Sequence, residues 1–364
     1  MKYGILTFHR AHNYGAMLQA IALRAKLAEN SNEVFFIDYW PKKHQEEYKI
    51  FNKDIFSKIS FLGKLNYIRK YFRDRSAKKR RIAIFESFFD KYMLPFTTEG
   101  HDVNFDAIFY GSDQIWRKRP EHGDDFDDVF FAKNDYHTRS HIAYAASMGV
   151  IFDGDDDLRY LKQAMTRFDH IGVRESDLKD LLEKAGVSEI SLNIDPTFLL
   201  DKHKWTEILD LRINNKERYI LFYDLMYGSF DLNAVKEFAK AKGLKLKVLK
   251  GRIDREKYDV ETISDAGPRE FVELIANAEY VFTSSFHGLA FSLIFGKQFY
   301  ASYQRNSARA ATILGSLGLS DRLLPPLSPS IPAMERIDYA EIDQKMGKLR
   351  RSSEDYLKMA VREL

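Results

Sequence analysis

The sequence predicts an α/β protein of two halves, each a parallel sheet with crossover helices. Short apolar runs of strand length alternate with segments that repeat apolar residues at helical spacing. This alternation occurs in one series before residue 200 and in a second series after it. A chain of 364 residues is long enough for two domains. We therefore expect an N-terminal domain over residues 1–200, a C-terminal domain over residues 201–364, and an active-site cleft between them.

The first half opens with a strand, a helix and a second strand, the repeating unit of a parallel sheet. Two insertions interrupt the alternation. Residues 41–100 are charged, aromatic and helical in pattern, and residues 117–139 lack periodicity, so we expect a long loop there. The expected strands are 3–8, 34–39, 105–110, 141–147, 170–174 and 190–194, and the expected helices are 16–29, 156–168 and 176–185.

The second half repeats the same alternation. Four prolines fall within residues 319–334, so no regular element is expected there. Residues 340–364 predict a terminal helix, which we expect to pack back on the first domain. The expected strands are 219–224, 245–249, 279–283 and 298–301, and the expected helices are 232–242, 268–277 and 288–295.

The composition excludes several classes of protein. The 56 Lys and Arg residues nearly balance the 53 Asp and Glu residues, which argues against a nucleic-acid partner. The chain has no cysteine, which removes disulfides, cysteine-based zinc sites, iron–sulfur clusters and a cysteine nucleophile. No signal peptide and no run of about 18 apolar residues is present, so we expect a cytoplasmic protein.

One segment departs from this charge balance. Residues 69–81, RKYFRDRSAKKRR, hold eight basic residues and one acid, with aromatic side chains beside them. Such a helix predicts peripheral contact through residues 67–81 with the inner face of a membrane. A solvated basic helix is the simpler alternative, and both interpretations stay open.

Polar loops follow several of the expected strands, at the edge where ligands bind in such sheets. The loop containing His12, Asn13, Tyr14 and Gly15 opens a helix, whose free N–H groups favour an anion or a sugar hydroxyl; a polar surface turn is the alternative. Asp113 follows the strand 105–110 and is a candidate proton carrier, or a helix cap.

Two further loops carry basic side chains. Arg174 ends a strand, where its guanidinium can grip a carboxylate or phosphate or simply pair with Glu175. Asp195 precedes Pro196, which fits a turn former.

The strongest signal is Ser284-Ser285-Phe286-His287-Gly288 at the start of an apolar helix. Ser284 or Ser285 caps that helix, Gly288 allows close approach of a ligand, and His287 supplies an acid or base beside a phosphate cradle.

Six segments occur in a characteristic order: GILTFHRAHNYGAMLQA, FDAIFYGSDQIW, YAASMG, GVRES, DPTFLL and VFTSSFHGLAFSLIFGK. Together they resemble the polysaccharide pyruvyl transferases. The resemblance implies a glycosyltransferase-B-like fold of two Rossmann-like domains. It also implies transfer of pyruvate from phosphoenolpyruvate onto two hydroxyls of a sugar in a polysaccharide or its precursor. That reaction forms a cyclic ketal, releases phosphate, needs no cofactor or metal, and belongs to capsule or exopolysaccharide biosynthesis.

The resemblance also implies that His287 and Arg174 hold phosphoenolpyruvate. From the residues themselves, His287 and Asp113 are expected to be catalytic, and the acceptor is expected to be a sugar or a lipid-linked oligosaccharide. A nucleotide-sugar glycosyltransferase and a non-catalytic glycan- or phosphate-binding protein stay open as alternatives. The donor-binding residues are expected to be Arg174, Ser284, Ser285, His287 and Gly288, and the acceptor-binding residues His12, Asn13, Tyr14 and Gly15.

Overall fold

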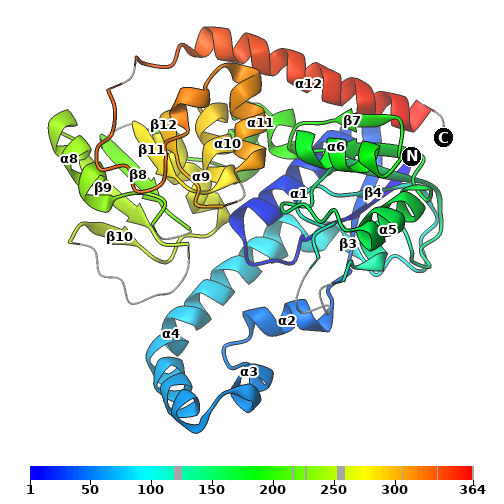
Figure 1. Ribbon diagram of the computed structural model, residues 1–364, viewed down its shortest axis with the longest axis horizontal. Coiled ribbons are helices and arrows are strands. Elements are labelled where there is room, and N and C mark those ends of the chain that lie inside the picture. The colour runs from blue at the N-terminus through cyan, green and yellow to red at the C-terminus, as the bar shows by residue number, and fades with distance from the viewer. Residues whose placement is uncertain are drawn as a thin grey trace.

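The computed structural model contains two parallel sheets, one of seven strands and one of five (Figure 1). Within the described residues, every strand pair is parallel, and each sheet has helices against its faces. The predicted fold class of two Rossmann-like domains is therefore confirmed. The structure describes residues 1–118, 125–214, 217–225, 228–251, 259–305, 307–333 and 335–362.

The N-terminal sheet has the strand order β3-β2-β1-β4-β5-β6-β7. The order changes direction between β1 and β4, and ligands bind at such switch points in open α/β sheets. Its strands are β1 (Lys2–Leu6), β2 (Glu33–Ile37), β3 (Thr97–Thr98), β4 (Phe105–Tyr110), β5 (Thr138–Ala146), β6 (His170–Val173) and β7 (Ile190–Leu192). Its main helices are α1 (Tyr14–Leu27), α5 (Asp155–Met165) and α6 (Ser176–Lys184).

The C-terminal sheet has the order β10-β9-β8-β11-β12, with its switch point between β8 and β11. Its strands are β8 (Tyr219–Tyr223), β9 (Lys245–Leu249), β10 (Glu261–Ile263), β11 (Tyr280–Thr283) and β12 (Gln298–Ala301). Its helices are α8 (Leu232–Lys242), α9 (Pro268–Asn277), α10 (Phe286–Ile294) and α11 (Ala308–Leu317), and α7 (Lys202–Leu209) precedes the sheet.

One continuous apolar core joins the two domains. Central strands such as β8 are buried along their whole length, as expected for parallel strands that are covered on both faces. Tyr14 at the start of α1 stacks on Phe271 of α9, with ring centres 4.7 Å apart. Its hydroxyl donates a hydrogen bond to the Ala266 carbonyl at 2.8 Å. The two switch points are thereby held facing each other.

The insertion over residues 41–100 is largely helical, as its pattern predicts. It consists of α2 (Lys42–Tyr48), α3 (Lys53–Lys58) and the long α4 (Phe61–Tyr92), followed by a 3₁₀ turn (Leu94–Phe96) and the edge strand β3. The N-terminal half of α4 projects from the body of the molecule together with α3 (Figure 1). The C-terminal half packs on the protein through Phe85, Phe88 and Phe89.

Helix α12 (Tyr339–Arg362) crosses from the C-terminal domain back to the first domain, as predicted (Figure 1). The Tyr356 hydroxyl donates to the Ala143 carbonyl in β5 at 2.6 Å. The Ser353 hydroxyl accepts a hydrogen bond from the Ile194 amide at 3.0 Å. The terminal helix therefore braces the two domains.

Several elements differ from the expectations. Helices α7 and α11 and strands β3 and β10 were absent from the predicted series, and the proline-rich stretch 319–334 holds a 3₁₀ turn at Ser320–Arg322. The segment 117–139 forms a 3₁₀ turn at Asp128–Phe131 that buries Phe130 and Phe131; its residues 119–124 lie outside the described part of the chain. Aromatic side chains anchor this segment where only a loop was expected.

Candidate active site

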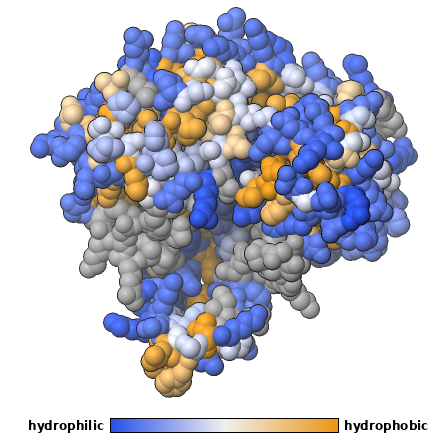
Figure 2. Space-filling model, viewed as in Figure 1, coloured by the Kyte–Doolittle hydropathy of each residue, from blue (hydrophilic) through white to orange (hydrophobic). Residues whose placement is uncertain are grey.

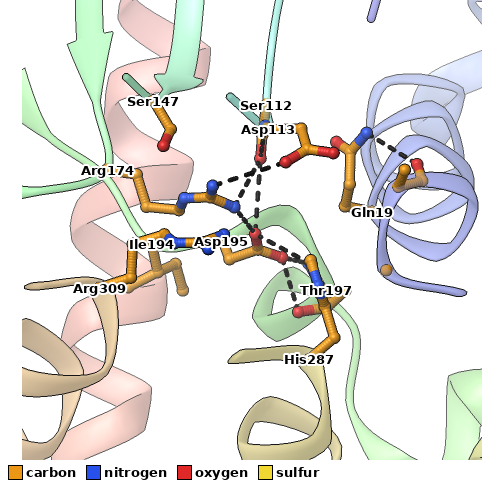
Figure 3. Close-up of polar contacts among 12 residues, drawn as sticks. Gln19, Ser112, Asp113, Ser147, Arg174, Ile194, Asp195, Thr197, His287 and Arg309 are labelled. Atoms are coloured by element: carbon orange, nitrogen blue, oxygen red, sulfur yellow. Dashed lines mark hydrogen bonds and ion pairs between the residues drawn. The ribbon is translucent and has the colours of Figure 1, made fainter. Parts of the chain in front are cut away.

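Loops from both switch points meet at one buried cluster of charged side chains (Figure 3). The N-terminal domain supplies Asp113 after β4, Arg174 after β6 and Asp195 after β7. The C-terminal domain supplies His287 at the start of α10 and Arg309 at the start of α11. Five segments far apart in the sequence therefore converge, as expected at the carboxyl ends of parallel strands.

Asp195 is the centre of this cluster. Its Oδ1 accepts hydrogen bonds from the Thr197 amide at 3.0 Å and the Thr197 hydroxyl at 2.7 Å. Its Oδ2 accepts from Nη1 of Arg174 and lies 3.5 Å from Nε2 of His287. Burial alone would raise the pKa of Asp195, but His287, Arg174 and Thr197 outweigh burial and hold that pKa well below its usual range. Asp195 caps the 3₁₀ turn Pro196–Leu199, which confirms its interpretation as a turn former. It is in addition an anion that contacts both a guanidinium and an imidazole.

His287 is buried and comes within contact of the opposite domain. Ser285 caps α10 by accepting a hydrogen bond from the Gly288 amide at 3.3 Å, which fixes the backbone around His287. A Cβ atom placed on Gly15 would lie 1.8 Å from Nδ1 of His287. Only glycine at position 15 leaves room for the imidazole, so the first loop helps to form the pocket that holds His287.

A second arginine lies beside Arg174. The guanidinium carbons of Arg174 and Arg309 are each 5.2 Å from the centre of the Phe286 ring. Oε1 of Glu175 is 3.6 Å from Nε of Arg174 and 3.9 Å from Nε of Arg309. Burial lowers the pKa of Arg309, and the charge of Arg174 lowers it further. Two cations held this close favour an anion between them.

The unpaired donors of the cluster also favour an anionic ligand. Burial raises the pKa of Glu175 against the opposing effect of Arg174 and Arg309, so burial weakens Glu175 as a counter-charge. Nε and Nη2 of Arg174 and Nε of Arg309 are buried with no hydrogen-bond partner within the described residues. Buried donors in native proteins are nearly always paired, so these donors indicate a missing acceptor.

Asp113 connects this cluster to a neighbouring cavity. Its backbone has a φ of 73°, a left-handed conformation that is uncommon for residues other than glycine and is often found at functional sites. Its Oδ1 accepts from the Gln114 amide at 2.8 Å and lies 3.9 Å from Nη2 of Arg174. The carboxylate is therefore placed between the arginine cluster and the cavity.

The cavity beside Asp113 has a volume of about 200 Å³ and a polar, aromatic lining. Nε1 of Trp40 in its wall is buried without a hydrogen-bond partner in the described residues. Aromatic rings mixed with a few convergent polar groups are typical of small-molecule sites. The lining residues are Phe8, Arg10, Ala11, Asn13, Ala16, Tyr39, Trp40, His44, Tyr48, Asp113 and Gln114.

The structure separates the four residues of the first loop that were expected on the acceptor side. Asn13 lines the cavity, and its Oδ1 caps α1 by accepting from the Gly15 and Ala16 amides at 2.9 and 3.3 Å. Nε2 of His12 lies 2.8 Å from Oε1 of Glu86 and thereby joins the loop to α4. Tyr14 contacts the C-terminal domain and Gly15 contacts His287, so an acceptor-binding role stays a prediction for all four residues.

The residues around His287 shape the start of α10. The Ser284 hydroxyl donates to Asp224 at 2.6 Å and accepts from the Leu225 amide at 2.8 Å. A Cβ atom on Gly288 would lie 2.3 Å from Oγ1 of Thr283, so that side chain fills the space that we expected a ligand to approach. Donor binding by Ser284, Ser285 and Gly288 stays a prediction.

Arg309, Glu175 and Asp195 were not among the predicted site residues. The sequence around Arg309, SARAATILGSLG, is rich in alanine, serine and glycine, so it has little of the contrast between apolar and polar positions that indicates a helix. Two features of the sequence could have indicated these residues. Asp195 follows an expected strand, as the predicted site residues do. The helix that carries Arg309 has apolar residues at helical spacing, which the structure buries: Ala310, Ile313, Leu314 and Leu317.

The described residues show neither a metal-ligating group nor a membrane-spanning helix. No three His, Asp or Glu side chains come together as a metal-ligating group. No helix in that part of the chain is both long enough and apolar enough to span a membrane.

Comparison with known proteins assigns the chain to a family. A family model described as polysaccharide pyruvyl transferase matches residues 13–304, a span that includes Arg174, Asp195 and His287 and ends before Arg309. No curated protein matches the chain.

Among solved structures, the chain is similar to a UDP-GlcNAc 2-epimerase of Methanocaldococcus jannaschii, with 10% identity, a TM-score of 0.46 and 99% of each chain covered. It is also similar to the heptosyltransferase WaaC of E. coli, with 12% identity, a TM-score of 0.42, and 96% of this chain and 100% of that chain covered.

Proposed function

The chain belongs to the polysaccharide pyruvyl transferase family, and we propose that it transfers pyruvate from phosphoenolpyruvate onto two hydroxyls of a sugar in a polysaccharide or its precursor. The product is a cyclic ketal, and phosphate is released. The observation that carries this proposal is a buried cluster of Arg174, Arg309 and His287. Each of these side chains has at least one buried nitrogen without a hydrogen-bond partner in the described residues.

The donor suits this cluster chemically. Phosphoenolpyruvate carries a phosphate and a carboxylate, and guanidinium groups bind both through paired hydrogen bonds. Arg174 and Arg309 both lie within 4 Å of the same oxygen of Glu175, and each is near the Phe286 ring. We assign the two arginines to the two anionic groups of the donor.

His287 is the proposed acid. It protonates the methylene carbon of the donor, which makes the adjacent carbon electrophilic. The proton would be carried on Nε2, which lies 3.5 Å from Oδ2 of Asp195, and the charge of that carboxylate stabilises the protonated imidazole. The carbon–hydrogen bond formed in this step creates the methyl group of the ketal.

Asp113 is the proposed base on the acceptor side, because its carboxylate faces both the arginine cluster and the cavity. One sugar hydroxyl attacks the electrophilic carbon and loses its proton to Asp113. The carbon–oxygen bond to phosphate then breaks, and the second hydroxyl closes the ring. The two hydroxyl protons balance the one given to carbon and the one that leaves with phosphate.

The aromatic cavity is the proposed acceptor site. The rings of Tyr39 and Trp40 offer apolar faces to a sugar, and Asn13 and Gln114 offer polar groups to its hydroxyls. A lipid-linked acceptor extends this proposal, whereas membrane contact through residues 67–81 is independent of it. Its place in capsule or exopolysaccharide biosynthesis rests on the family alone.

The test is turnover by His287→Ala with phosphoenolpyruvate and a panel of p-nitrophenyl hexosides, followed by phosphate release and product mass. We expect a loss of at least about 100-fold, because the variant lacks the acid. His101→Ala is the control, since His101 is exposed and pairs with Asp135. Normal turnover by His287→Ala would show that His287 is not the acid. Transfer of a hexosyl group from a nucleotide sugar would contradict pyruvyl transfer and support a glycosyltransferase.

A further inference from the structure

Helix α4 carries an apolar stripe on its outer side that the fold leaves exposed. Phe61 is 75% exposed and Phe72 is 63% exposed. Together with their neighbours they form an apolar patch at the projecting end of the molecule (Figure 2). Single exposed apolar residues are normal, but a gathered patch marks an interaction site. We call the following residues the outer stripe: Phe61, Leu62, Leu65, Ile68 and Phe72.

The inner side of the same helix segment has its own packing. Phe51 lies 5.3 Å from the ring of Tyr67 and 5.4 Å from that of Tyr71, and Phe56 lies 5.7 Å from Tyr67. The Tyr67 hydroxyl accepts a hydrogen bond from the Asn52 amide at 2.8 Å. The α3–α4 hairpin is therefore held together from within, and the outer stripe is not needed for that packing.

The charge around the outer stripe indicates its partner. Residues 61–81 contain nine Lys and Arg residues and one acid, a balance of +8 in a chain whose net charge is +3. At about 100° per residue, Arg69 and Arg73 flank the stripe on one side, and Lys64 and Arg75 flank it on the other. Apolar side chains between rows of cations are typical of helices that lie in the surface of an anionic membrane.

We propose that the outer stripe binds the surface of an anionic lipid bilayer and thereby brings the acceptor cavity to that surface. The same insertion forms both features, because His44 and Tyr48 of α2 line the cavity and Glu86 of α4 pairs with His12. The acceptor is then the saccharide end of a lipid-linked molecule. This last step rests on the proposed function, whereas the bilayer contact does not.

A second copy of the chain fits the stripe less well. A symmetric contact through this face would bring two segments of +8 charge together, and juxtaposed like charges oppose association. Nucleic acid would satisfy the charges but leave Leu62, Leu65 and Ile68 exposed, because its recognition uses cations and planar rings. A bilayer satisfies both the charged and the apolar groups.

The first test is co-sedimentation of the full chain with vesicles of phosphatidylcholine alone and of phosphatidylcholine with phosphatidylglycerol. We expect binding only to the anionic vesicles and a decrease of at least about tenfold in Phe61→Asp/Phe72→Asp. Met359→Asp on α12 is the control, because Met359 is an exposed apolar residue of another helix. Binding that is equal in the stripe variant and the wild type would overturn the proposal, as would the absence of binding to anionic vesicles.

The second test measures by fluorescence quenching whether the stripe inserts into the bilayer. Phe72→Trp should lose fluorescence when the vesicles contain brominated lipid, and Met359→Trp should not. Of the three native tryptophans, Trp116 and Trp205 are fully buried and contribute a constant background. Equal quenching of both variants would contradict insertion through the stripe. The stripe variant could instead bind vesicles like the wild type and lose a solution dimer or RNA binding. That result would assign the stripe to a second copy of the chain or to RNA.

The bilayer contact and the pyruvyl transfer can be tested independently of each other. Titration of the stripe variant with phosphoenolpyruvate should match the wild type, since the start of α4, which carries the stripe, projects away from α10 and α11, which carry part of the cluster (Figure 1). Vesicle binding without donor binding would leave the bilayer contact intact and reject pyruvyl transfer. Donor binding without vesicle binding would reject the bilayer contact alone.

Discussion

At the scale of single residues, the closest fit in the site is between Gly15 and His287, which come from different domains. A methyl group at position 15 would overlap the imidazole, with a Cβ-to-Nδ1 distance of 1.8 Å. Gly15→Ala should therefore displace His287 from Asp195. We expect a loss of turnover of about 100-fold, the effect of misplacing a catalytic group by about 1 Å.

The chain contains a matched control for this substitution. Gly315 lies within α11, and a Cβ atom there would meet nothing within 4 Å. Gly315→Ala should keep full turnover and gain a little stability, because alanine favours helix over glycine by about 1 kcal/mol. Equal turnover in Gly15→Ala and Gly315→Ala would show that the imidazole does not need this space.

Asp195 should make the free energy of unfolding depend on pH below about pH 3.8. Its pKa is lowered in the folded state, so its carboxylate stabilises the fold above the unfolded value of 3.8 and loses that effect as the pH falls. Asp195→Asn should lower the free energy of unfolding by about 3–5 kcal/mol at neutral pH, because Arg174 loses its buried partner.

Urea unfolding at several pH values measures this difference. Below pH 3.8 the gap between wild type and Asp195→Asn should shrink by about 1.4 kcal/mol per pH unit. A gap that stays constant down to pH 3 would mean that Asp195 is not an ion in the folded protein.

At the scale of elements, α11 matters because it brings Arg309 to the cluster. Arg309→Lys should raise the KM for phosphoenolpyruvate by about tenfold with a smaller change in kcat, because lysine cannot make the paired hydrogen bonds of a guanidinium. Steady-state kinetics with varied donor measure both constants. Arg269→Lys is the control, since Arg269 caps carbonyls near the surface. An unchanged KM would make Arg309 a structural partner of Glu175.

The sequence was sufficient to predict most of the elements. Strand 219–223 is a continuous apolar run because both faces of its sheet are covered, and strand 105–110 is apolar except for Asp106; both patterns are visible without a structure. Short elements such as β10 and α11 were missed, since three residues or a small-residue helix carry little pattern.

The site was predictable only in part. Arg174, Asp113 and His287 follow strands, and that position alone marked them as candidates. Asp195, the partner that Arg174 and His287 share, was not predicted as a site residue, because no local pattern shows that loops from two domains meet. For the same reason, the contact between Gly15 and His287 depends on the packing of α1 against α10, which sequence spacing does not encode.

At the scale of the whole molecule, the cluster depends on how the two domains are held together. The buried hydrogen bond from Tyr356 to Ala143 fixes α12 on the first domain at 2.6 Å. Tyr356→Phe should lower the free energy of unfolding by about 1–2 kcal/mol, because a buried carbonyl loses its donor. Tyr71→Phe, in the α3–α4 hairpin, is the control. Equal stability of both variants in thermal unfolding would show that this bond does not brace the domains.

Calorimetric titration tests the central claim, that the cluster binds phosphoenolpyruvate, most directly. The wild type should bind phosphoenolpyruvate, and His287→Ala and Arg174→Lys should bind it more weakly, while a panel of nucleotide sugars should give no heat of binding. Binding of a nucleotide sugar without binding of phosphoenolpyruvate would contradict the assignment of the cluster and support glycosyl transfer.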